Sequence, residues 1–200
     1  MTDVLLGSQH TTSPVIIELG CGPNPPSGVI GVDALPLPGV SVVADLEAGL
    51  PFLADDSVDE VRSRHLLEHV DDLVGLLREI HRVLRPGGVH RCVVPHFSNP
   101  YYFSDPTHER FFGLYTFDYM SQDVGVESIR RPLPKFYFDF EFKIIERRLV
   151  FSSHWGIHSR MGMAATKVFN RTTAAQEFYE RHLCWTFPCQ ELHFVMTPVK

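Results

Sequence analysis

The sequence predicts an α/β fold with a mostly parallel sheet, and three features support this prediction. Short apolar runs end in glycine or aspartate, as buried parallel strands do. An amphipathic helical segment joins two of these runs and completes a strand, helix, strand series. The chain of 200 residues is 44% hydrophobic and 21% charged, which is ordinary for a globular domain. A chain of this composition buries a core and is not disordered over most of its length.

The first half of the chain contains five expected strands and one clear helix. The strands cover residues 15–19, 29–33, 40–45, 58–63 and 88–95. Leucine and isoleucine recur at helical spacing from Leu73 to Leu84, and Asp71-Asp72 precedes them at the positive end of the helix dipole. The segment Pro86-Gly87-Gly88 ends this helix.

The second half is rich in aromatic side chains and less regular. Asp105 followed by Pro106 is typical of a helix N-cap, which predicts a short helix through Leu114. The remaining expected elements are a long or bent strand over 136–151, a helix over 172–185 and a closing strand over 191–198. Residues 151–171 receive no assignment from their pattern.

Composition also limits the function. The formal charge is −6 and the basic runs are only Arg130-Arg131 and Arg147-Arg148, which disfavours a nucleic-acid partner. The four cysteines form no C-x-x-C pair, a pattern typical of a reducing compartment. The N-terminal stretch does not resemble a signal peptide, and no apolar run is long enough for a membrane helix. We therefore expect a cytoplasmic monomer or homodimer without a membrane partner.

Polar signals follow three successive strands of the predicted sheet. The segment Glu18-Leu19-Gly20-Cys21-Gly22 completes the first strand, and its glycines allow a sharp turn and the close approach of a ligand. Asp33 ends the second strand and Asp45 the third, where carboxylates accept hydrogen bonds from ribose hydroxyls and an adenine amino group. The three positions therefore indicate one crevice at the carboxyl edge of the sheet. Taken singly, the glycines also fit a tight turn and each aspartate a cap.

The sequence of the same loop indicates which kind of nucleotide the crevice accepts. A dinucleotide site usually has G-x-G-x-x-G, but this chain has Pro25 in place of the third glycine. It also has no P-loop lysine, so a phosphate cradle is not predicted. A nucleoside without phosphates fits better, and a nucleotide-dependent oxidoreductase stays as an alternative.

Several segments occur in the order seen in one enzyme family. Besides the glycine loop, they are Gly31-Val32-Asp33, Ala44-Asp45-Leu46, Leu50-Pro51-Phe52, Ser63-Arg64-His65-Leu66-Leu67-Glu68-His69 and Val83-Leu84-Arg85-Pro86-Gly87-Gly88. On these segments the chain resembles class I S-adenosylmethionine-dependent methyltransferases of the type 11 group over residues 14–96. The resemblance implies a Rossmann-like three-layer sandwich, a mostly parallel seven-stranded sheet with an antiparallel last strand, and an insertion after the fifth strand.

The resemblance also implies S-adenosylmethionine as the cofactor and S-adenosylhomocysteine as the product. By this resemblance Gly20 and Gly22 lie against the methionine part, Asp33 holds the ribose, and Asp45 and Leu46 flank the adenine. The backbone after the fourth strand faces the methionine amino group. The expected cofactor-binding residues are Glu18, Gly20, Cys21, Gly22, Asp33, Ala34, Asp45, Leu46, Ser63, Arg64 and His65.

Two connections depart from the family pattern. Residues 23–28 and 34–39 are too few for the helical crossover that relatives place there, so one face of the sheet is expected to be thinly covered. We still expect a single domain. Its parts are a cofactor-binding core over 14–96, a substrate-facing insertion with the sixth strand over 97–171, and a C-terminal helix and closing strand over 172–200.

The aromatic segment after the fifth strand is the expected acceptor site. His96 lies at the carboxyl end of that strand and His108 in the expected helix, and we predict both as catalytic candidates. A histidine suits the removal of a proton from an acceptor hydroxyl because its pKa is near neutral. Asp105 completes a set whose residue types suit a metal, but the spacing matches no metal motif. An N-cap role for Asp105 and a backbone hydrogen bond for His108 are the structural alternatives.

The leading hypothesis is methyl transfer to an oxygen or nitrogen of a small-molecule acceptor. One alternative is a metal-assisted methyltransferase that uses His96, Asp105 and His108. Another is a non-enzymatic binding module on the same scaffold, because function belongs to the site and not to the fold.

Overall fold

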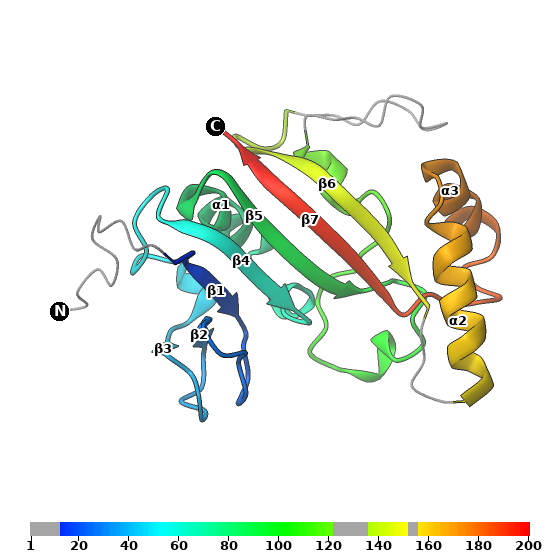
Figure 1. Ribbon diagram of the computed structural model, residues 1–200, viewed down its shortest axis with the longest axis horizontal. Helices are drawn as coiled ribbons and strands as arrows, with labels where there is room; N and C mark the ends of the chain where they lie inside the picture. The colour runs from blue at the N-terminus through cyan, green and yellow to red at the C-terminus, as the bar shows by residue number, and fades with distance from the viewer. Residues whose placement is uncertain (1–12, 122–135, 152–155) are drawn as a thin grey trace.

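One sheet organises the molecule (Figure 1). The computed structural model describes residues 13–121, 136–151 and 156–200, without the side chains of 156–159. Within this part of the chain, seven strands form a single sheet in the order β3-β2-β1-β4-β5-β7-β6. The predicted α/β fold with a mostly parallel seven-stranded sheet is therefore confirmed.

The strands are short at one end of the sheet and long at the other. Their bounds are β1 Ile16–Leu19, β2 Ile30–Asp33, β3 Val42–Val43, β4 Val58–Arg64, β5 Leu84–Pro95, β6 Glu141–Val150 and β7 Glu191–Val199. Each predicted strand forms, although β3 is much shorter than expected and β5 already begins where α1 ends. The α-helices are α1 Leu73–Val83, α2 Gly156–Phe169 and α3 Thr173–His182, and the short 3-10 helices are η1 Leu46–Ala48, η2 Leu67–His69, η3 Tyr102–Ser104 and η4 Thr116–Met120.

The strand directions place several carboxyl ends at one edge. β1 pairs in parallel with β2 and β4, β2 with β3, and β4 with β5. β7 runs antiparallel between β5 and β6, as the resemblance implies for the last strand. The pairing of β6 with β7 shifts register between Ile144 and Glu146, which accounts for the bend expected in this strand.

The two short connections are made without helices. Residues 20–29 and 34–41, all of them described, form turns and extended loop. They pack tightly because a Cβ on Gly31 would lie only 2.7 Å from the sulfur of Cys21 and 3.1 Å from Pro25 Cγ. The prediction of helix-free crossovers on this side is confirmed.

The helices α1 and α3 begin at capping side chains. Asp72 accepts a hydrogen bond from the N–H of Gly75 at 2.9 Å and starts α1, whose buried residues are Leu76, Leu77, Ile80 and Val83. Thr172 accepts from the N–H of Ala175 at 3.1 Å and starts α3, as expected from the pattern over 172–185. α2 occupies most of the stretch left without assignment, and it packs against β6 and α3 at the far end from β3 (Figure 1).

The helix predicted from Asp105 to Leu114 does not form, since these described residues make turns and extended backbone. Asp105 Oδ1 accepts from the N–H of Thr107 at 2.9 Å and from its hydroxyl at 2.6 Å, which stabilises a turn instead of a helix start. Phe112 then pairs with His96 in an isolated parallel bridge and is fully buried. Burial of this aromatic ring outweighs a short helix, which is marginal by itself.

The core lies along the central strands. Fully buried side chains include Ile17, Leu19, Val61, Val94 and Leu192. Among the helices of the described residues, none is both long and apolar enough to cross a bilayer.

Candidate functional site

A loop with two left-handed glycines follows β1. Gly20 has φ of +64° and Gly22 of +62°, a conformation that favours glycine. Cys21, between them, donates its backbone N–H to the carbonyl of Val32 at 3.2 Å and ties the loop to β2. A Cβ on Gly20 would lie 2.9 Å from Leu66 Cδ1, whereas one on Gly22 would meet nothing within 4 Å. The backbone at Gly22 is therefore open to a ligand.

Asp33, at the end of β2, holds this loop in place. One carboxylate oxygen accepts from the N–H of Gly22 at 2.9 Å, and the other accepts from the N–H of Leu35 at 3.1 Å. A carboxylate offers about four acceptor positions, so each oxygen keeps one for a further donor such as a ribose hydroxyl. The exposed Ala34 lies beside it in the same turn. Asp33 thus combines the predicted binding position with a structural role in the turn.

Asp45 and Leu46 follow β3 at the same edge of the sheet. Asp45 accepts from the N–H of Glu47 at 3.0 Å and caps η1, as the structural alternative for this residue anticipates. Its side chain is exposed and accessible to a ligand. Leu46 is buried in the core, with 8% of its surface exposed, so little of its side chain is left to contact an adenine.

The charge at the predicted crevice suits a cationic ligand. Oε2 of Glu18 is buried and has no hydrogen-bond partner among the described residues, so a donor on a ligand would satisfy it. Burial raises the pKa of the Cys21 thiol, and the negative charges of Asp33 and Glu18 raise it further. The same carboxylates attract a sulfonium or ammonium group and repel phosphates. The residues therefore fit a positively charged nucleoside better than a dinucleotide.

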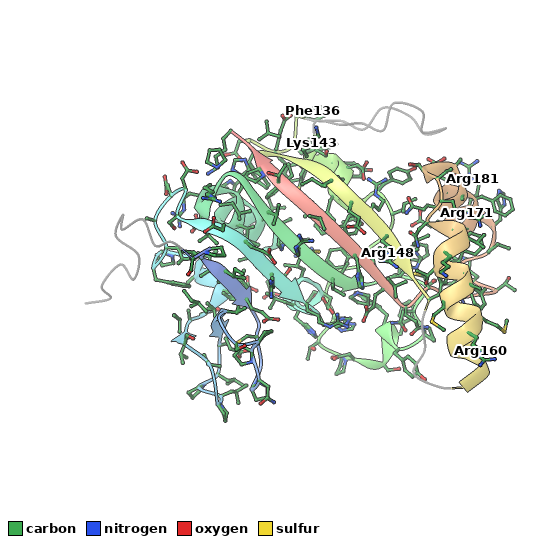
Figure 2. The ribbon with its side chains drawn as sticks, viewed as in Figure 1. Phe136, Lys143, Arg148, Arg160, Arg171 and Arg181 are labelled. Atoms are coloured by element: carbon green, nitrogen blue, oxygen red, sulfur yellow. The ribbon has the colours of Figure 1, made fainter. Side chains whose placement is uncertain are left out.

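Positive side chains are spread along the β6 edge of the sheet and over α2 and α3. Figure 2 shows Lys143, Arg148, Arg160, Arg171 and Arg181 on β6, on α2 and α3, and on the turn between these helices. β6 and β3 are the two opposite edges of the sheet. These cations are therefore remote from the glycine loop and do not offset its negative charge.

The side chains at the end of β4 serve the structure. The hydroxyl of Ser63 lies 2.9 Å from His90 Nε2, and complete burial lowers the pKa of His90 to about 3, so its ring is neutral. Arg64 reaches Glu191 on β7 at 2.9 Å. The resemblance implies that the backbone of Ser63 and Arg64 faces the cofactor, and this stays a prediction.

His65 is held as a cation between two carboxylates. Its φ is +50°, an uncommon value for a residue with a side chain. Its Nε2 lies 3.0 Å from Glu191 Oε1 and its Nδ1 3.1 Å from Glu68 Oε1. Hydrogen bonds to Glu191, and then to Glu68, raise the pKa of His65 to about 9. The same network, with His193 as the first cause, lowers the pKa of Glu191. His65 is therefore an unsuitable base at neutral pH.

A hollow lies beyond the carboxyl ends of β4 and β5. Its volume is about 270 Å³, and it is formed by the segment after β4, the end of β5 and the aromatic segment that follows β5. The lining residues are His65, Glu68, His69, Pro95, Asn99, Tyr101, Tyr102, Asp105 and His108. Leu66 connects this hollow to the glycine loop, because it contacts Gly20 and lies between lining residues.

His108, one of the two predicted catalytic residues, lines this hollow. Its Nδ1 lies 2.9 Å from the carbonyl of Tyr102, and because a carbonyl only accepts, Nδ1 carries the proton. Nε2 of the neutral ring is then an acceptor, 3.8 Å from Asp105 Oδ2. The ring of His69 lies beside it, with centroids 4.7 Å apart. The backbone hydrogen bond considered for His108 is present, and Nε2 remains available.

His96, the other predicted catalytic residue, is fully buried. Its Nδ1 accepts from the N–H of Ser98 at 3.0 Å, and its Nε2 lies 3.5 Å from Glu180 Oε1. His96 pairs with the fully buried Phe112 in an isolated parallel bridge at the edge of the core. Among the described residues, one group of potential metal ligands has its ligand atoms close together, and it contains His108 but neither His96 nor Asp105. The structure therefore does not assemble the metal set of His96, Asp105 and His108.

Glu68 is a site residue that its sequence pattern alone did not indicate. It belongs to the segment after β4 that carries the resemblance, and its side chain is completely buried while lining the hollow. The available signal was the close spacing of His65, Glu68 and His69, which places three polar side chains on one tight turn. Their convergence with His108, however, depends on a contact between distant parts of the chain.

Comparisons with known proteins agree with this fold. A family model described as a methyltransferase domain, of the type 11 group, matches residues 28–92, about a third of the chain. No curated protein sequence matches the chain. The matched segment contains β2 to β4 and the greater part of β5, including Asp33 and the hollow-lining turn after β4.

Solved structures with the same fold match nearly the whole chain. A chain from the complex of the Haloferax volcanii Trm112 methyltransferase activator with a methyltransferase is 19% identical, with a TM-score of 0.57, 94% of this chain covered and 83% of that chain. A SAM-dependent methyltransferase from Archaeoglobus fulgidus is 18% identical, with a TM-score of 0.51 and coverages of 92% and 85%. The [4+2]-cyclase SpnF is 16% identical, with a TM-score of 0.53 and coverages of 100% and 79%.

The fold defines a class: this is an α/β protein of the class I methyltransferase type. Within that class, the family model confirms the predicted resemblance to the type 11 S-adenosylmethionine-dependent methyltransferases. The structural identities are low and establish the fold alone, and one neighbour is a cyclase, so the reaction has to be argued from the site.

Proposed function

We propose that the protein transfers the methyl group of S-adenosylmethionine to an oxygen or nitrogen of a small-molecule acceptor. When bound, this cofactor supplies a methyl group activated on a positively charged sulfur. The observation that carries the proposal is the negative charge at the predicted crevice, which combines the open glycine loop, Asp33 and the unpartnered oxygen of Glu18. The hollow that follows it offers room for an acceptor.

The residues of the crevice divide into binding and positioning roles. Asp33 accepts the ribose hydroxyls while it keeps the loop at Gly22 in place. Glu18 accepts from a donor group of the cofactor with its free oxygen. Leu66 packs beside the loop at Gly20, and it belongs to the same turn that supplies His65, Glu68 and His69 to the hollow.

The acceptor side is aromatic, and His108 contributes an accessible acceptor nitrogen to it. Tyr101 is 74% exposed at the rim of the hollow, which suits stacking on a planar or apolar acceptor. His108 presents Nε2 as a proton acceptor, whereas His96 is enclosed in the core. Alignment of acceptor and methyl group, with removal of one proton, is the work that such a transfer requires.

Transfer of label from methyl-labelled S-adenosylmethionine into a cell extract or a metabolite panel tests the proposal. We expect labelled small molecules with the full chain, and a large loss of label with Asp33→Ala. Asp139→Ala is a matched control because Asp139 is exposed and pairs with Arg78 on α1, outside the crevice. Cofactor binding without any label transfer would instead support a non-enzymatic binding module.

A nucleotide-dependent oxidoreductase is the contrasting enzyme class. Saturation-transfer NMR with a nicotinamide cofactor and S-adenosylmethionine separates the two. Binding of the nicotinamide cofactor alone would overturn the proposal.

The proposal also includes the setting of the protein. The four cysteines are free thiols, which supports a reducing compartment such as the cytoplasm. We infer that it acts there as a monomer or homodimer on a small molecule, without a nucleic-acid or membrane partner. Light scattering of the purified chain tests the oligomeric state.

A further inference from the structure

Three metal-ligating side chains converge at the hollow. Glu68, His69 and His108 each offer a ligand atom, and these atoms all lie within 4.8 Å of one another. Two of the residues belong to the turn after β4, while His108 comes from the aromatic segment after β5. The group is therefore assembled by the fold and is not a feature of one local stretch.

Glu68 provides the second observation that points to a ligand. Its carboxylate is completely buried, and Oε1 lies 3.1 Å from Nδ1 of His65. Oε2 is also buried and has no hydrogen-bond partner among the described residues. A buried carboxylate oxygen without a donor is costly, and a bound cation would remove that cost. Because Glu68 lines the hollow, a cation there would be within its reach.

The two histidines are oriented as metal ligands usually are. His108 Nδ1 donates to the carbonyl of Tyr102 at 2.9 Å, which leaves the lone pair on Nε2. His69 Nδ1 lies 3.3 Å from the carbonyl of Thr107 and 2.9 Å from its hydroxyl, which assigns the proton to the same nitrogen. A histidine ligand typically donates its other ring N–H to a carbonyl or carboxylate in this way.

We propose that Glu68 Oε2, His69 Nε2 and His108 Nε2 bind one divalent transition-metal cation of the Zn²⁺ type. Two imidazoles and one carboxylate form a typical three-residue set for catalytic zinc, with the fourth position open to the hollow. Mg²⁺ and Ca²⁺ prefer oxygen ligands and fit less well. Tetrahedral zinc keeps its ligand atoms about 3.4 Å apart, so the ligand atoms need to approach one another by at most about 1.4 Å on binding.

The role of the cation rests on the proposed function, although its binding does not. An acceptor hydroxyl at the open position would coordinate the cation, which lowers the pKa of that hydroxyl and lets its proton pass to solvent. Nε2 of His108 is then a metal ligand in place of the proton acceptor. Asp105 Oδ2, 3.8 Å from this nitrogen, stabilises the positive charge of the site.

Titration of the metal-free full chain with Zn²⁺, without the cofactor, tests the site by calorimetry. Visible absorption of bound Co²⁺ reports the nitrogen-containing coordination independently. We expect one ion per chain, and at least about tenfold weaker binding for Glu68→Gln, His69→Asn and His108→Asn. His182→Asn is the matched control because His182 is exposed on α3. Unchanged Zn²⁺ affinity in all three variants, or no binding by the full chain, would overturn the site.

Label transfer with and without metal separates this inference from the proposed function. We expect a chelator to stop label transfer, Zn²⁺ to restore it, and melting curves to show that Glu68→Gln remains folded. Zn²⁺ binding without label transfer to any acceptor would leave the site standing and contradict the proposed function. Full label transfer by the metal-free chain would refute the catalytic role of the cation.

Discussion

Removal of the Asp33 carboxylate gives a quantitative test of the cofactor site. In the ligand-free chain this side chain accepts from the N–H of Gly22 at 2.9 Å and of Leu35 at 3.1 Å. Two further acceptor positions are assigned to the ribose hydroxyls. A hydrogen bond to a charged group contributes about 1.5 kcal/mol or more, so loss of both ribose bonds costs about 3 kcal/mol. We therefore expect Asp33→Ala to weaken binding of S-adenosylhomocysteine about 100-fold.

The same substitution also removes an anchor of the glycine loop, so loop disorder must be separated from loss of the ribose contacts. An analogue of S-adenosylhomocysteine without the two ribose hydroxyls provides this separation. The unsubstituted chain should bind the analogue about 100-fold more weakly than S-adenosylhomocysteine, whereas Asp33→Ala should bind both equally. Asp139→Ala should behave as the unsubstituted chain does, because its pairing with Arg78 lies outside the crevice.

Competition calorimetry on the four combinations of chain and ligand measures the coupling directly. If Asp33→Ala keeps the full preference for the ribose hydroxyls, Asp33 does not read the ribose. If the substitution weakens the binding of both ligands and removes the preference for the ribose hydroxyls, the Asp33 carboxylate binds the ribose as assigned. Near-equal affinity of the unsubstituted chain for both ligands would place the ribose elsewhere.

Three further predictions concern stability. Gly22→Ala should reduce the free energy of unfolding by about 1–2 kcal/mol in urea titrations, because φ is +62° and the site is otherwise open; no change would contradict the backbone argument. His90 binds a proton far more weakly when the chain is folded, with a pKa of about 3, than when it is unfolded, with a pKa of 6.5. The free energy of unfolding is therefore highest above pH 6.5 and decreases as the pH falls from 6.5 towards 3. At pH 5 the free energy of unfolding should be about 2 kcal/mol lower than at pH 8. If His90→Gln does not flatten this dependence of stability on pH, the assignment to His90 is refuted. Arg82→Met should cost about 2 kcal/mol in the same titrations, because the guanidinium donates to the carbonyls of Leu50 and Leu53 at 3.0 Å each; an unchanged urea midpoint would contradict this assignment.

Features encoded by neighbouring residues were predictable. The glycine loop after β1 and the aspartate at the end of β2 follow from short patterns, and the structure places both at one edge through parallel pairing. The helix α1 was also predictable, because the regular spacing of its apolar residues and its N-cap at Asp72 are local patterns. In each case the backbone geometry is fixed by residues only a few positions apart.

Features that depend on contacts between distant residues were not predictable. The expected helix after Asp105 is replaced by turns because Phe112 is buried against the end of β5. His96 points into the core for the same reason, which no spacing within its own strand reveals. Glu68 gains its significance only when His108 is folded against it, about forty positions further along the chain.

The most direct test of the account is a calorimetric titration of the full chain with S-adenosylmethionine, beside a parallel titration with NADH. The negative charge at the predicted crevice, the open backbone at Gly22 and the Asp33 carboxylate predict binding of S-adenosylmethionine in the micromolar range and no heat from NADH. Absence of S-adenosylmethionine binding at millimolar concentration, or tight binding of NADH, would contradict the account.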